Sequence, residues 1–136
     1  MSPDTTPELY WLAATATFTA LLWLPYILSF ILQIGVVPAV EGRKYAASLE
    51  AGWADRAKRA HGNAVENLVV FGALAIVVHI LDAGTALTAA AAHAYFFTRV
   101  AHYFIYLFGI PFLRVVSFAV GVVCQLILAA TLFGLV

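Results

Sequence analysis

Charged residues are scarce in this 136-residue chain. Asp, Glu, Lys and Arg together make up 10% of it, and the formal net charge is zero. A soluble domain carries roughly 25% charged residues, because its surface must be hydrated. With 64% hydrophobic residues and a mean hydropathy of +0.97, this chain has too few polar groups to cover itself in water. The composition therefore predicts an integral membrane protein.

Three further absences narrow the possibilities. The chain has one cysteine, Cys124, so no internal disulfide can form. It has neither a net positive charge nor a basic arm, which excludes a nucleic-acid partner. The N-terminal segment MSPDTTPELYW lacks the basic residues that open a cleavable signal peptide, so we expect the first apolar stretch to be retained as a membrane span.

Four hydrophobic segments are each close to or longer than the ~20 residues that cross a bilayer as a helix. Short connectors at residues 82–85 and 109–111 force the helices that they join to run antiparallel. The sequence therefore predicts an all-α polytopic membrane protein, a single domain of residues 1–136 built as an up-down bundle of four transmembrane helices. Pro25 should kink the first helix. The expected spans cover residues 9–34, 57–81, 86–108 and 112–135.

The basic residues predict how the chain is oriented. Cytoplasmic loops of membrane proteins are enriched in Lys and Arg. Here the N-terminal tail, the connector at 82–85 and the C-terminus contain neither. We therefore expect both termini on the non-cytoplasmic side and the first and third connectors in the cytoplasm. The basic residues near the span ends are Arg43, Lys44, Arg56, Lys58 and Arg59 around the first connector and Arg114 after the third.

Two of the expected helices carry a polar stripe. In the second span Arg59, Asn63 and Glu66 are spaced by four and three residues, which places them on one helical face. In the third span Arg99, His102 and Tyr106 are spaced by three and four. Ionisable residues inside a membrane span face the protein interior and mark functional sites. The two stripes are therefore expected to face each other.

Glu66 and Arg99 lie at similar depth, each ~13 Å along its helix from the cytoplasmic face. We expect them to belong to one network, within a chain or across a subunit boundary. One interpretation is a purely structural ion pair, although such pairs rarely stabilise a protein more than apolar packing does. The other is a ligand site. An excess of Arg with one Glu favours an anionic ligand that also carries an amine, because guanidinium groups bind carboxylates bidentately.

Two motifs resemble a known family. The segment RAKRAHGNAVENLVVF contains the pattern R-A-H-x-N-x-x-E-N that opens the second span in the MAPEG family, the membrane-associated proteins in eicosanoid and glutathione metabolism. The segment RVAHYFIYLFGIPFLR resembles the third-span pattern of the same family: an Arg, a His three residues on, a Tyr four further, and another Arg across the turn.

The resemblance implies a homotrimer that binds glutathione between neighbouring subunits near the cytoplasmic face. It also implies a glutathione transferase or peroxidase in which the glutathione thiolate attacks a hydrophobic substrate that enters from the lipid. Arg114 and Tyr106 are the candidates for stabilising the thiolate, and Ser117 is a further possible donor. The implied glutathione-binding residues are Arg59, Asn63 and Glu66 from one subunit and Arg99, His102, Tyr106 and Arg114 from another. Ser117 lies three residues after Arg114, and its hydroxyl either adds to this site or bonds back to its own helix.

Other interpretations stay open. Gly62 stands where catalytic members of the family often carry a basic or polar residue, which leaves a non-catalytic lipid-binding or accessory subunit as the alternative. A small transporter or channel is disfavoured, because the half of the membrane beyond Glu66 and Arg99 has few polar residues. We expect no metal, since the guanidinium groups near His61 and His102 would repel a cation.

Overall fold

The computed structural model describes residues 5–40 and 52–136, and all the regular structure in these ranges is α-helical. The predicted all-α class is confirmed for this part of the chain. Arg43 and Lys44, which entered the predicted orientation, lie outside the described residues. The helices are α1 (Pro7–Leu21), α2 (Leu24–Ile34), α3 (Val36–Val40), α4 (Gly52–Ile80), α5 (Ala86–Phe108) and α6 (Pro111–Leu132).

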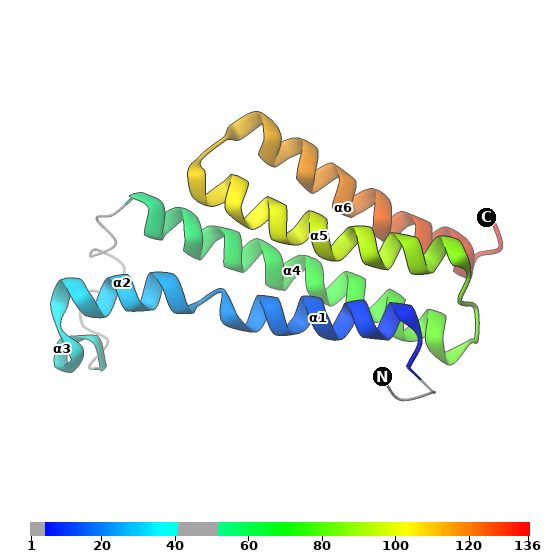
Figure 1. Ribbon diagram of the computed structural model, residues 1–136, viewed down its shortest axis with the longest axis horizontal. Helices are drawn as coiled ribbons and strands as arrows, with labels where there is room; N and C mark the ends of the chain where they lie inside the picture. Colours follow the sequence, from blue (N-terminus) through cyan, green and yellow to red (C-terminus); the bar gives the residue numbers. More distant parts are fainter. Residues whose placement is uncertain (1–4, 41–51) are drawn as a thin grey trace.

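The long helices lie side by side along the length of the molecule (Figure 1). α1 and α2 follow roughly one line, α4 runs back beside them, and α5 and α6 continue the alternation. α5 packs against α1, α4 and α6, and α4 packs against α1, α2, α5 and α6, so these two helices occupy the centre of the arrangement. The start of α1, the end of α6 and the α4–α5 turn lie at one end of the molecule, and the α5–α6 turn lies at the other. The polar stripe of α5 therefore has helices packed on both sides of it.

The first expected span is broken in the middle, as Pro25 predicts. α1 ends at Leu21 and α2 begins at Leu24, with Pro25 in the first turn of α2. Proline has no N–H to bond to the carbonyl four residues before it, and its ring crowds that carbonyl, which belongs to Leu21. The helix consequently ends one turn before the proline and restarts with the proline at a position that tolerates it.

The ends of α5 are fixed by specific contacts. At its start, the Thr85 side chain accepts a hydrogen bond from the Thr88 backbone N–H, and the Thr88 hydroxyl accepts one from the Thr85 N–H. This capping box satisfies two donors that the helix leaves open. At its end Gly109 adopts a left-handed conformation with φ of 71°, and Arg56 Nε donates to the Leu107 carbonyl at 2.8 Å. Arg56 thus ties the start of α4 to the end of α5.

The side chains packed between the helices are mostly small or aromatic, and those on the outside are mostly apolar. Phe71 of α4 and Tyr95 of α5 stack with ring centroids 3.9 Å apart, among Ala75, Ala91 and Ala92. Such small residues let helices approach closely in membranes. Many large apolar side chains point outward, which is what a lipid-facing surface requires.

Three segments of the described chain are long and apolar enough to cross a membrane: Pro7–Ile34, Gly52–Ile80 and Pro111–Leu132. α5 has the predicted bounds, Ala86–Phe108, but does not reach the same hydropathy within the described residues. Its threonines, histidines and tyrosines and its buried Arg99 lower the mean, and a helix packed by other helices need not be uniformly apolar.

Candidate functional site

The two sequence motifs meet at a cavity of about 170 Å³ between α4, α5 and α6. It lies toward the end of the molecule where α5 turns into α6. Most of its polar lining comes from predicted site residues. The lining residues are Asn63 from α4, His102 and Tyr106 from α5, and Arg114, Val115 and Phe118 from α6.

Arg99 lies behind this cavity, with 4% of its side chain exposed. Its Nη1 donates to Asn63 Oδ1 and its Nη2 to the Ser117 carbonyl, both at the long distance of 3.4 Å. The guanidinium also lies 5.5 Å from the ring centroid of Tyr95 and 5.8 Å from that of Phe118. Its Nε has no hydrogen-bond partner in the described part of the chain. Arg99 is therefore a buried cation held only by neutral groups.

Gly121 provides the space that Arg99 occupies. A Cβ atom at this position would lie 2.6 Å from Arg99 Nη2, closer than real Cβ atoms come to other atoms. Any larger residue on this turn of α6 would therefore displace the guanidinium. Sequence reasoning missed Gly121, although its position seven residues after Arg114 places it on the same face of α6.

A hydrogen-bonded chain orients His102. The Ser117 hydroxyl donates to the Arg114 carbonyl at 3.1 Å, and His102 Nδ1 lies 2.8 Å from the same hydroxyl oxygen. The roles of the two imidazole nitrogens depend on the tautomer: where the Ser117 proton lies toward the Arg114 carbonyl, Nδ1 is the donor and Nε2 is an acceptor. His102 Nε2 is buried and has no partner among the described residues. Ser117 thus both bonds back to its own helix and fixes the histidine.

Arg114 and Tyr106 form the outer part of the site. The Arg114 guanidinium carbon lies 4.9 Å from the centroid of the Tyr106 ring, a cation–π contact. The Tyr106 ring also meets His102 edge to face, with centroids 5.9 Å apart. Arg114 itself is exposed. Within residues 5–40 and 52–136, neither Arg99 nor Arg114 has a carboxylate within 4.0 Å. The site therefore holds two guanidinium groups without a counter-ion.

Arg59 and Glu66 lie outside the cavity. Arg59 Nε pairs with Asp55 Oδ2 at 2.9 Å on the exposed surface of α4. Glu66 is exposed and forms no ion pair with Arg99 inside the chain. Residues three apart differ by about 60° around a helix. Asn63 faces α5, and Glu66 is rotated away from it. Of the three polar residues in the α4 stripe, only Asn63 therefore faces the stripe of α5 within one chain. A contact between Glu66 and Arg99 across a subunit boundary stays a prediction.

Asn63 lies close to the α5–α6 residues within one chain. It bonds to Arg99 and lines the same cavity as His102. The sharing of the site between subunits that the resemblance implies stays a prediction.

Two buried polar groups that extend the network were not among the candidate site residues. The Gln125 amide donates to the Asn67 carbonyl at 3.1 Å and to the Tyr95 hydroxyl at 3.3 Å. These bonds join α4, α5 and α6 one turn deeper than Arg99. Tyr95, four residues before Arg99, lies on the same face of α5, and this spacing was the signal available in the sequence. No cluster of three or more metal-ligating side chains is present in the ranges that the structure describes.

Comparison with known proteins agrees with the motifs. A model of the MAPEG family matches residues 10–134. The chain belongs to the MAPEG family. No curated protein and no solved structure matches it significantly. MAPEG membership covers all of the helices that form the cavity, and it is consistent with glutathione-dependent roles in a membrane.

Proposed function

We propose that this MAPEG protein is a membrane-bound glutathione transferase or peroxidase that acts on hydrophobic electrophiles. The observation that carries the proposal is the cavity beside Arg99, where two guanidinium groups lack a counter-ion and His102 Nε2 lacks a hydrogen-bond partner among the described residues. An uncompensated charge inside a membrane protein is costly, so such a set of groups favours an anionic ligand with N–H or S–H donors.

Glutathione fits this chemistry. It has two carboxylates, one ammonium group, amide N–H groups and a thiol. Arg99 and Arg114 would bind carboxylate or thiolate, Asn63 offers an amide, and His102 Nε2 accepts a hydrogen bond. The exposed Glu66 and Arg59 lie on the same helix as Asn63, where they would take the ammonium and a further carboxylate.

The chemical step would use the thiolate. A free thiol is mostly protonated near neutral pH, and the thiolate is the nucleophile. A nearby cation favours the anionic form. Arg114 is the candidate for this role, because it is exposed at the mouth of the cavity and lies beside the Tyr106 ring. The Tyr106 hydroxyl would be a second donor. The thiolate sulfur then bonds to the electrophilic carbon of the acceptor, and the leaving group takes the displaced electron pair.

Oligomerisation completes the proposed site. Ligand pockets have volumes of roughly 300–1,000 Å³, and the cavity of about 170 Å³ is too small to enclose a tripeptide. A neighbouring subunit packed against the α4–α6 face would enlarge it and cover Glu66. We therefore propose a homotrimer. In its subunits α5 would also cross the membrane and bring the number of spans to four, both termini would be non-cytoplasmic, and the site would lie near the cytoplasmic face.

A non-catalytic lipid-binding or accessory subunit is the second candidate. The observation that favours it is Gly62. No atom lies within 4 Å of where its Cβ would be, so the outer edge of the motif offers a ligand no side chain at this position. The charge network would then serve binding alone.

Calorimetric titration of the detergent-purified protein with glutathione separates the two. We expect saturable binding that Arg99→Ala weakens by roughly tenfold or more, since hydrogen bonds to charged groups are the strong ones. Glu66→Gln should also weaken it, whereas Thr17→Ala, which removes an exposed hydroxyl bonded only to its own helix, should not.

Turnover of a chlorodinitrobenzene electrophile tests catalysis. Arg114→Ala should lower kcat more than it changes the affinity for glutathione, because its charge is needed most by the thiolate. No heat at millimolar glutathione would overturn the enzyme proposal. Binding without turnover would favour the accessory subunit.

A further inference from the structure

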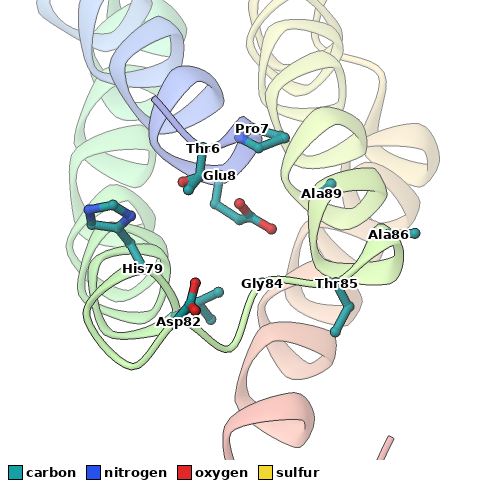
Figure 2. Close-up of a pocket in the computed structure, with 10 residues that line it drawn as sticks. Thr6, Pro7, Glu8, His79, Asp82, Gly84, Thr85, Ala86 and Ala89 are labelled. Carbon is teal, nitrogen blue, oxygen red and sulfur yellow. The ribbon is translucent and has the colours of Figure 1, made fainter. Parts of the chain in front are cut away.

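A second cavity, of about 380 Å³, lies at the opposite end of the molecule from the glutathione site. It is enclosed by the start of α1, the end of α4, the following turn and the start of α5 (Figure 2). Its polar lining comes from Thr6, Glu8, His79, Asp82 and Thr85. None of these residues takes part in the proposed transferase chemistry.

Glu8 is the central group of this cavity. Its side chain is 2% exposed, and Oε1 accepts a hydrogen bond of 2.6 Å from the Thr88 hydroxyl. Thr88 belongs to the capping box of α5, so Glu8 also places its negative charge at the positive end of that helix. This accounts for one carboxylate oxygen. An ionised carboxylate has about four acceptor sites, and no further donor to Glu8 is found in the described part of the chain.

Two more side chains bring oxygen atoms to the same cavity, Thr6 and the exposed Asp82. The Thr6 hydroxyl oxygen is buried and forms no hydrogen bond within the described residues. Buried polar groups are almost always hydrogen-bonded, so an orphan of this kind points to an absent partner. Asp82 brings a second carboxylate, and Figure 2 shows the Glu8 and Asp82 carboxylates on facing sides of the cavity. Capping of α5 explains neither Thr6 nor Asp82.

No Lys or Arg lies near these carboxylates in sequence. The seven Lys and Arg residues of the chain begin at Arg43, and none occurs between Arg59 and Arg99. Arg99 lies more than three helical turns along α5 from Thr85, at the other end of the bundle. The described lining of the cavity therefore has two carboxylates and one base, the imidazole of His79.

We propose that this cavity binds a primary ammonium group. A primary ammonium carries three N–H donors, and the cavity lining offers the Glu8 and Asp82 carboxylates and the Thr6 hydroxyl as acceptors. A quaternary ammonium has the charge but no donors, so it would leave Thr6 unsatisfied. The described residues contain no cluster of three metal-ligating side chains, which disfavours a divalent metal.

The ammonium can come from two sources. The cavity lies at the end of three segments long enough to span a bilayer, which places it at the level of lipid headgroups. An ethanolamine headgroup would present its ammonium there. A free diamine in solution has the same chemistry.

Binding should be compared in nanodiscs of phosphatidylcholine, with and without phosphatidylethanolamine, by native mass spectrometry. Titration with putrescine in phosphatidylcholine nanodiscs is the second arm. We expect ethanolamine lipid to be retained over choline lipid, and Glu8→Gln to reduce this preference by roughly tenfold or more, because it replaces a charge-assisted hydrogen bond by a neutral one. Putrescine binding without a lipid preference would assign the site to free amines.

Two further variants guard against a Glu8→Gln protein that does not fold. Asp82→Asn and Thr6→Val alter the cavity without touching the Glu8–Thr88 bond, and each should weaken amine binding. Asp55→Asn is the matched control, because it removes an exposed carboxylate at the other end of α4. Equal retention of choline and ethanolamine lipid together with no putrescine binding would overturn the proposal, and so would tight calcium binding that displaces putrescine. Glutathione titrations of the same variants should be unchanged, so the two proposals can fail independently.

Discussion

At the scale of single residues, the site depends on how Arg99 is accommodated. A guanidinium with 4% exposure has to be surrounded on all sides, and here the ring of Tyr95, the ring of Phe118 and the bare backbone of Gly121 surround it. The two hydrogen bonds that it donates are long, at 3.4 Å. The side chain is thus confined by shape more than by strong bonds, and a ligand carboxylate would gain most of the remaining interaction.

Gly121→Ala tests this confinement. The added methyl group would force Nη2 to move, and a shift of about 1 Å in a positioned group can reduce turnover by roughly a hundredfold. We expect weaker glutathione binding and lower turnover, with a loss of about 1–3 kcal/mol in the free energy of unfolding from overpacking. Calorimetry and denaturant titration measure the two effects.

Gly62→Ala is the control, because its Cβ would meet nothing within 4 Å. Glutathione binding should be unchanged there, and the helix should gain about 0.5–1 kcal/mol in stability. Unaltered binding in Gly121→Ala would contradict the role given to Arg99.

Much of the site could be predicted from residue spacing. The two errors of that prediction, at Glu66 and Gly121, have a related cause. Asn63, His102, Tyr106 and Arg114 line one cavity, and their role in binding glutathione stays a prediction. Glu66 does not face Arg99, because the sequence fixes angles along one helix but not the rotation of that helix against its neighbour. Gly121 was missed for a related reason. A glycine points to a close contact only when the group that fills the space beside it is known, and here that group is Arg99 of another helix.

At the scale of the helices, the ends of α5 decide how the site is held. The predicted bounds 86–108 are the observed ones, because Thr85 and Gly109 are strong start and stop signals. The division of the first span into α1 and α2 also follows from Pro25. The short helix α3, Val36–Val40, was not predicted, since five apolar residues show no helical periodicity of their own.

Gly109→Ala is the element-scale prediction. Gly109 has φ of 71°, and a left-handed conformation costs roughly 1–2 kcal/mol for a residue with a Cβ atom. The new Cβ would also lie 3.4 Å from Arg56 Nε and press on the bond to Leu107. We expect the free energy of unfolding, measured by SDS titration in mixed micelles, to fall by about that amount. Gly109→Asn should cost less, because Asn tolerates this conformation. Equal losses in both variants would argue against backbone strain as the cause.

At the scale of the whole molecule, the apolar exposed surface is the feature that identifies a membrane protein. Exposed apolar side chains such as Val69 (69% exposed), Val115 (63%) and Leu126 (61%) cover the helices, while Arg99 and His102 lie inside. The composition was enough to predict that apolar side chains cover the outside of this protein. The number of crossings is harder to predict, because α5 shares its surface with other helices and loses hydropathy where it carries the site.

Cysteine labelling tests the proposed crossings and their direction. In a Cys124→Ala background, single cysteines replacing Thr5 and Leu135 should react with an impermeant maleimide on sealed vesicles that expose the non-cytoplasmic face. A cysteine replacing Phe108, next to the α5–α6 turn, should react only after the vesicles are opened. Labelling of the two termini from opposite sides would rule out an even number of spans.

The bond between Glu8 and Thr88 has a consequence for synthesis. The two residues are 80 positions apart in the chain, and a ribosome adds about 5–20 residues per second. For roughly 4–16 seconds after Glu8 emerges, its carboxylate exists without the helix end that later receives it. During that interval a buried position for Glu8 is unfavourable. This favours a position of the first helix at the membrane surface or beside the translocation machinery. The final seating of the N-terminus is thus coupled to the arrival of α5, which makes the start of the chain one of the last parts to settle.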